Sequence, residues 1–135
     1  MIQEFVNRFM DKKGILELDF SLRHPGSYKD IVQKVISLIN EDSDYEYPDP
    51  NNIVEIDHGN YQGTLLYIIP ECGYQPYRYW YVRVSYGSCS GCDTLYSIRG
   101  YSDELPSEQQ VSDYLILALH IVQGIHELGE GCCLD

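Results

Sequence analysis

Cys89 and Cys92, a C-x-x-C pair, are the residues whose type and spacing could most directly support chemistry. They lie in a run of small polar residues between a strand-like segment that ends at Tyr86 and a short helix-like segment that begins at Thr94. Two thiols at this spacing can chelate zinc, form a redox disulfide, or occupy a tight turn. A tetrahedral zinc site would need further ligands, and the candidates are His58 and one of Cys72, Cys132 and Cys133.

A nucleophilic site and a purely structural loop are the remaining interpretations of the same cysteines. Cys89 with His58 and Asp57 would form a Cys-His-Asp set of the kind that activates a thiol. In the structural interpretation, the thiols are small residues in a glycine-containing loop, and Asp93 caps a helix that begins at Thr94. We favour the structural interpretation and expect binding rather than catalysis.

Strand order predicts which other residues lie near the C-x-x-C pair. Residues 53–56, 64–69 and 79–86 read as the strands of an antiparallel meander, joined by a turn at 57–62 and a loop at 71–78. In such a meander the 57–62 turn and the 87–94 loop meet at one end of the sheet. The predicted binding residues are Asp57, His58, Tyr61, Gln62, Ser88, Cys89, Cys92, Asp93 and Thr94, with Cys89 and Cys92 as possible zinc ligands.

The elements that must support this end of the sheet are predicted from hydrophobic periodicity. Helices are expected over residues 2–12, 27–40 and 106–128, with Ser27 and Ser107 as N-caps. Residues 15–22 alternate between apolar and polar side chains, which predicts a further strand. The expected fold is therefore α+β: an antiparallel meander sheet of three to four strands, with helices packed mainly on one face, in a single domain over residues 1–135.

Charge and composition narrow the classes of partner. The chain has 9 Lys and Arg against 21 Asp and Glu, a net charge of −12, which disfavours direct binding to nucleic acid or to an anionic membrane. No run approaches the roughly 18 apolar residues that a membrane-spanning helix needs. Five cysteines, two of them adjacent, fit a reducing compartment. A basic protein surface is the expected partner.

Two sequence strings resemble a known group of proteins. They are Asp57-His58-Gly59-Asn60-Tyr61-Gln62-Gly63-Thr64-Leu65 and Tyr86-Gly87-Ser88-Cys89-Ser90-Gly91-Cys92-Asp93-Thr94-Leu95. Together with Leu119-His120-Ile121-Val122-Gln123, they resemble a family of small uncharacterised proteins encoded by bacteriophages and large-genome viruses. The resemblance covers roughly residues 53–128 and implies a viral origin rather than a mechanism.

Two functional hypotheses follow from the charge, the candidate site and the resemblance. The first is a small acidic phage accessory protein in the host cytoplasm, a host-takeover or anti-defence factor that binds a basic host protein. The alternative is a small-molecule or zinc site, catalytic or ligand-sequestering, formed by the 57–62 and 87–94 loops.

Overall fold

The computed structural model describes residues 2–40, 47–59, 63–73, 78–87, 93–100 and 104–128. These residues form an α+β fold, as predicted. The helices are α1 (Ile2–Leu22), α2 (Tyr28–Ile39), α3 (Thr94–Arg99) and α4 (Glu108–Gln123). The strands are β1 (Val54–Gly59), β2 (Gly63–Pro70), β3 (Tyr79–Tyr86) and β4 (His126–Glu127). Within the described part of the chain, no helix is long and apolar enough to cross a membrane.

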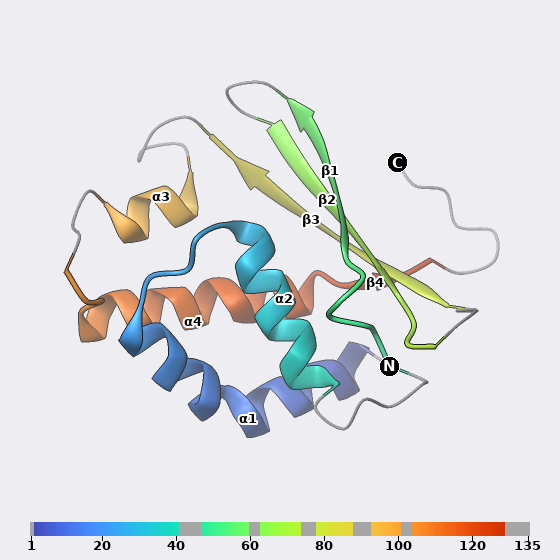
Figure 1. Cartoon of the computed structure of the whole chain (residues 1–135), viewed down its shortest axis with the longest axis horizontal. Coiled ribbons are helices and arrows are strands. Elements are labelled where there is room, and N and C mark those ends of the chain that lie inside the picture. The colour runs from blue at the N-terminus through green and yellow to red at the C-terminus, as the bar shows by residue number, and fades with distance from the viewer. Residues whose placement is uncertain are drawn as a thin grey trace.

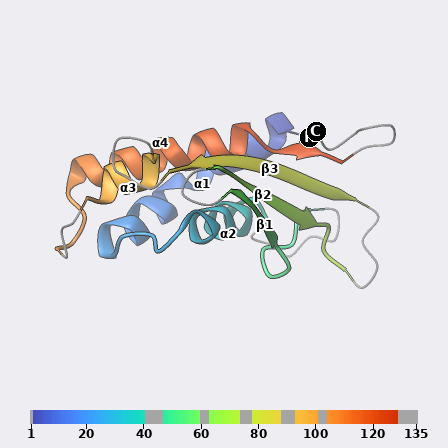
Figure 2. The same ribbon diagram turned by 90° about the horizontal axis from the view of Figure 1, so that it is seen from above.

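The strands form one antiparallel sheet in the order β1-β2-β3-β4 (Figure 1). The predicted meander of three strands is thus confirmed, with the apolar strand β2 between two neighbours. One face of the sheet carries buried side chains into the same core as the helices. Those side chains are Tyr67, Ile69, Trp80, Val82 and Val84. Figure 2 shows α4 on the β3 side of the molecule and α2 on the β1 side.

Helix α1 corrects the prediction that residues 15–22 form a strand, because the helix runs through Gly14 to Leu22. Leu16 and Phe20 are buried at helical spacing, whereas Leu18 is 63% exposed, so the apparent alternation does not mark one face. A glycine inside a helix costs about 1 kcal/mol. Burying a side chain such as Leu16 or Phe20 contributes about 1.5 to 3 kcal/mol, which outweighs that cost.

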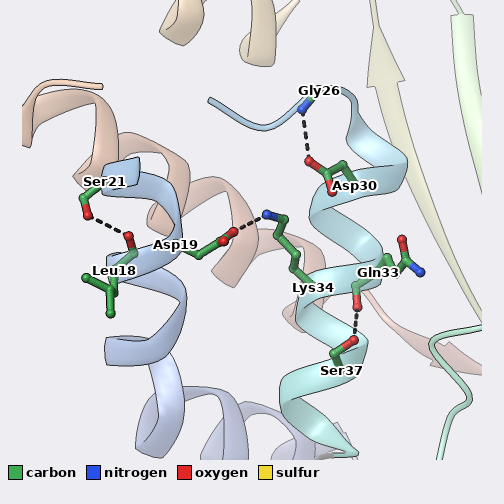
Figure 3. Close-up of polar contacts among 8 residues, drawn as sticks. All are labelled: Leu18, Asp19, Ser21, Gly26, Asp30, Gln33, Lys34 and Ser37. Atoms are coloured by element: carbon green, nitrogen blue, oxygen red, sulfur yellow. Dashed lines mark hydrogen bonds and ion pairs between the residues drawn. The ribbon is translucent and has the colours of Figure 1, made fainter. Parts of the chain in front are cut away.

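Helix α2 begins and ends where the sequence predicts. Ser27 is its N-cap and accepts a 3.2 Å hydrogen bond from the backbone nitrogen of Asp30. The Asp30 carboxylate in turn accepts one of 3.0 Å from the backbone nitrogen of Gly26. Lys34 of α2 forms an ion pair with Asp19 of α1 (Figure 3). These contacts fix the start of α2 and join α2 to α1.

The last predicted helix is shorter than expected. Ser107 caps α4 as predicted, but the helix ends at Gln123 rather than continuing to residue 128. At Gly124 an added Cβ would lie 3.3 Å from the carbonyl oxygen of His120, so the close approach there favours glycine. Beyond it, Ile125 is buried and β4 pairs with β3. The chain therefore returns to the sheet instead of extending the helix.

Candidate functional site

The strand register brings β1 and the end of β3 together. Gly59 lies opposite Gly63, and Gly63 lies opposite Tyr86. The Tyr86 hydroxyl donates a 2.6 Å hydrogen bond to Oδ1 of Asp57, across the intervening strand β2. This hydrogen bond raises the pKa of Tyr86 above its ordinary value. Asp57 is thus joined to the residue that directly precedes the 87–94 loop.

Asp93 is a buried carboxylate at the other end of that loop. Its Oδ1 accepts a 3.0 Å hydrogen bond from the backbone nitrogen of Tyr96, which confirms the prediction that it caps the helix starting at Thr94. The same oxygen accepts a 2.7 Å bond from the Tyr28 hydroxyl, and Oδ2 accepts a 2.9 Å bond from the backbone nitrogen of Gly87. Three donors therefore satisfy this carboxylate.

Tyr28 joins the start of α2 to the start of α3. Its hydroxyl donates to Asp93 and also accepts a 3.0 Å hydrogen bond from the backbone nitrogen of Leu95. Burial and the hydrogen bond to Asp93 raise the pKa of Tyr28 well above its usual range. Tyr28 therefore stays protonated and serves as a fixed structural link.

A pocket of about 380 Å³ lies between this network and the sheet. Its volume falls within the range of small-ligand sites, roughly 300 to 1,000 Å³. We call it the Tyr67 pocket. Its described polar lining comprises four tyrosines, three carboxylates, one arginine and one serine: Tyr28, Tyr67, Tyr86, Tyr96, Glu55, Asp57, Asp93, Arg99 and Ser27.

Glu55 and Asp57 enter this pocket from the face of the sheet that also builds the core. Residues two apart in a strand share a face, so Glu55 and Asp57 lie on the same side of β1. In the β1–β2 register, Glu55 lies opposite Tyr67 and Asp57 lies opposite Leu65. Both carboxylate residues are exposed, whereas Tyr67 is fully buried. The apolar face of the sheet thus continues at its edge into two acidic side chains.

Tyr67 is the buried polar group of the pocket. Its exposure is 0%, and no described residue provides its hydroxyl with a hydrogen-bond partner within 3.5 Å. Burial raises the pKa of Tyr67 far above its ordinary value, and the Glu55 carboxylate raises it further through its charge and through a hydrogen-bonding contact too weak to count as a hydrogen bond within 3.5 Å. The hydroxyl is therefore neutral, and buried polar groups of this kind are normally hydrogen-bonded.

The charged residues of the pocket differ in how many hydrogen bonds and ion pairs they form with described residues. Asp93 is satisfied by the donors described above, and Asp57 accepts one hydrogen bond from Tyr86. Neither Glu55 nor Asp57 forms an ion pair with any described lysine, arginine or histidine, and Arg99 forms none with a described carboxylate. The β1 wall can therefore accept hydrogen bonds from a donor-rich or cationic group.

The predicted site residues are placed as follows. Asp57 and the backbone of His58 belong to β1 rather than to the predicted turn, and His58 pairs with Thr64. Asp93 and Thr94 lie at the start of α3, where Asp93 is buried and Thr94 is exposed. The other predicted site residues lie outside the described residues: Tyr61, Gln62, Ser88, Cys89 and Cys92.

The zinc prediction rests mainly on residues outside the described ranges. Within those ranges, no three histidine, cysteine, aspartate or glutamate residues are grouped so as to hold a metal ion. Cys72 contacts Asn40, whose side-chain nitrogen lies 2.8 Å from the sulfur. A zinc site at Cys89 and Cys92 stays a prediction.

Of the described residues that line the pocket, only Asp57 and Asp93 belong to the predicted site; Tyr28, Glu55, Tyr67 and Arg99 are among those that were not predicted from the sequence. The signal for Glu55 was present, since it stands two positions before Asp57 and so shares its face of the strand. Tyr67 lies between the apolar pairs Leu65-Leu66 and Ile68-Ile69 of β2, where the sequence predicts a core residue. Tyr28 and Arg99 reach the pocket only through tertiary packing.

No family model, curated protein or solved structure matches this chain. The resemblance of its two loop strings to a viral protein family therefore stays a prediction.

Proposed function

We propose that this chain is a small acidic binding protein that engages a basic protein of the host in the host cytoplasm. In this proposal it is a phage-type accessory factor that acts in host takeover or against host defence. The net charge of −12 supports a basic partner, because complementary charge steers association and suppresses other partners. The proposal makes no use of catalysis.

One observation carries this proposal: Glu55 and Asp57 are exposed side by side on β1, and no described cation neutralises them. Among the described ion pairs, Lys34 pairs with Asp19, and Arg78 pairs with Glu71 and Glu127. The charges on β1 are therefore available to a partner. They also adjoin a pocket, which gives the partner a shape to recognise as well as a charge.

Affinity capture with charge-matched variants tests this function. The tagged chain is used as bait in host lysate at about 0.05 M and about 0.5 M salt, because charge-driven contacts weaken as salt screens them. One variant, Glu55→Gln with Asp57→Asn, removes the two β1 charges. The control, Asp11→Asn with Glu17→Gln, removes one aspartate and one glutamate charge from exposed positions on α1.

We expect the wild-type chain and the α1 control to retain the same basic protein at low salt and to release it at high salt. The β1 variant should lose at least about tenfold in affinity for that protein, once it is purified, because close interfacial charge pairs are worth more than 1.4 kcal/mol. Absence of any salt-sensitive partner would refute the proposal. An equal loss of affinity in the β1 variant and the α1 control would contradict a specific role for Glu55 and Asp57 and would indicate non-specific attraction by net charge.

A small-molecule site is the second candidate, and the Tyr67 pocket beside Asp57 and Asp93 is the observation that favours it. In the zinc form of this candidate, Cys89 and Cys92 supply two thiolates. Elemental analysis of the purified chain tests that form, since about one zinc per chain, lost in Cys89→Ser with Cys92→Ser, is expected if zinc is bound. A chain without zinc and without a ligand-induced thermal shift would eliminate this candidate.

A further inference from the structure

We infer that the Tyr67 pocket binds the guanidinium group of an arginine side chain presented by the partner protein. This inference rests on the proposed function and assigns the point of contact. It draws on three observations: two carboxylates free of ion pairs with described residues, a buried hydroxyl to which no described residue donates a hydrogen bond, and tyrosine rings in the same pocket.

The two carboxylates define where the cation lies. Glu55 and Asp57 project from the same face of β1, with their Cα atoms about 7 Å apart at the usual strand rise. A guanidinium group carries five N–H donors in a planar fork, so one such group placed between the two side chains can donate to both. Arg99 lies on α3, so its charge repels a cation near α3 and favours a position against β1.

The Tyr67 hydroxyl defines how deep the group reaches. Tyr67 lies on β2 directly opposite Glu55, it is 0% exposed, and its hydroxyl accepts no hydrogen bond from a described residue. A neutral tyrosine hydroxyl has lone pairs that accept hydrogen bonds. A guanidinium group that donates one N–H to Glu55 can donate a different N–H to this oxygen. The contact would satisfy a buried polar group that otherwise costs stability.

The aromatic lining favours arginine over lysine. Tyr86 and Tyr96 add rings to the pocket, and planar guanidinium groups stack on such rings while also forming hydrogen bonds at their edges. The chain already shows this kind of contact elsewhere, since the Arg8 guanidinium lies 4.0 Å from the centre of the Tyr47 ring. An anionic ligand is disfavoured because three carboxylates line the pocket against one arginine.

Capped peptides with a single variable residue test this inference on the full chain. Each peptide has a central arginine, lysine or citrulline between glycines, and binding is followed by NMR titration. Citrulline has the shape of arginine without its charge. We expect saturable binding of the arginine peptide, weaker binding of the lysine peptide, and at least about tenfold weaker binding of the citrulline peptide, because hydrogen bonds to charged groups are the strongest.

Variants of the chain locate the contact. Glu55→Gln should lower the affinity for the arginine peptide about tenfold, and Tyr67→Phe should lower it about threefold or more. Each substitution removes a partner of the guanidinium group. The α1 control, Asp11→Asn with Glu17→Gln, should leave the affinity within about twofold, because distant surface charges are screened. Equal binding of the arginine and citrulline peptides, or equal affinity in wild type and Tyr67→Phe, would overturn the assignment.

Two further results separate this inference from the proposed function. A basic partner that depends on Glu55 and Asp57 but is indifferent to Tyr67→Phe would overturn the pocket assignment and leave the proposed function standing. Agmatine, a free guanidinium compound without a peptide backbone, tests the source of the cation. Agmatine binding more tightly than the arginine peptide would overturn the assignment to a protein partner.

Discussion

The Tyr28 hydroxyl stands 2.7 Å from Oδ1 of Asp93, although 65 positions separate the two residues in the chain. Through this hydrogen bond, the first residue of α2 is tied to the residue that caps α3. The backbone nitrogens of Leu95 and Gly87 complete the network. The α3 wall of the Tyr67 pocket is therefore fixed by buried hydrogen bonds rather than by helix length, since α3 has only 6 residues.

Asp93→Ala should lower the free energy of unfolding by about 2 to 4 kcal/mol, because it removes a helix cap and leaves the buried Tyr28 hydroxyl without its acceptor. Asp93→Asn keeps an acceptor oxygen at the same place, so it should lower the free energy of unfolding by less than half as much as Asp93→Ala. Urea unfolding followed by circular dichroism measures both values. Equal losses in the two variants would contradict the role assigned to the Asp93 acceptor.

Tyr67→Phe and Tyr28→Phe remove the same atom from two buried tyrosines with opposite expected effects. Tyr67→Phe should leave the free energy of unfolding unchanged or raise it by up to about 1 kcal/mol, because it deletes a buried hydroxyl that has no described hydrogen-bond partner within 3.5 Å. Tyr28→Phe should lower it by about 1 to 2 kcal/mol, since two hydrogen bonds are lost. Urea unfolding of the ligand-free variants measures the difference, and a destabilised Tyr67→Phe variant would show that the Tyr67 hydroxyl has an internal partner.

Stability should decline in alkaline solution because of these same tyrosines. The folded protein holds the pKa of Tyr28 and Tyr67 above the unfolded value of 10.0, so above that pH the unfolded chain releases protons that the folded protein keeps. Each group therefore contributes stability that is fully present below about pH 10 and falls by up to about 1.4 kcal/mol per pH unit above it. Unfolding experiments between about pH 8 and about pH 11 should show this slope, reduced in Tyr28→Phe and in Tyr67→Phe.

Ultraviolet absorbance provides an independent check on the alkaline prediction. Tyrosinate absorbs at longer wavelength than tyrosine, so the ionisation of the tyrosines can be followed during a pH titration. In the folded protein, Tyr28 and Tyr67 should ionise only as the chain unfolds. If Tyr28→Phe and Tyr67→Phe reduced the absorbance change near pH 10.0 while circular dichroism was still native, the pKa argument would be wrong.

Gly14→Ala tests the continuous helix α1. Space around Gly14 is open, with no atom within 4 Å of an added Cβ, so alanine should raise the free energy of unfolding by about 0.5 to 1 kcal/mol through its higher helix propensity. The matched control is Gly100→Ala, where the space is equally open but φ is +63°. In Gly100→Ala the free energy of unfolding should fall by about 1 kcal/mol, because residues with a Cβ atom disfavour a left-handed backbone conformation. A loss of stability in Gly14→Ala would argue against a helix through this position.

Hydrophobic periodicity predicted an element correctly where the spacing of its apolar residues fits only a helix or only a strand. Ser27 and Ser107 were identified as N-caps because their side-chain oxygens precede clear helical runs, and Asp93 because its carboxylate precedes a short helix-like segment. The strand prediction for residues 15–22 was wrong because the spacing of Leu16 and Phe20 fits both a period of 2 and a helical i, i+4 pair. Only packing against the rest of the core selects between the two.

The pocket was predictable in part. Antiparallel strand order indicated that Asp57 would lie near the 87–94 loop, and the contact between Asp57 and Tyr86 agrees with this. Tyr28 and Arg99 could not be assigned to the same place, because their positions depend on how α2 and α3 pack beside the sheet. Cys89 and Cys92, the residues most suggestive of chemistry, lie outside the described residues.

The position of Glu55 and Asp57 on the outermost strand has a consequence for self-assembly. β1 is one edge of the described sheet, and an edge strand offers unpaired backbone groups to any other strand. If the β1 strands of two identical molecules paired, the four carboxylates would crowd onto one face of the joined sheet, where like charges repel. At the opposite edge β4 has only 2 residues and offers little backbone to extend. The acidic pair that opens the pocket therefore also discourages fibre-like growth of the sheet at high protein concentration.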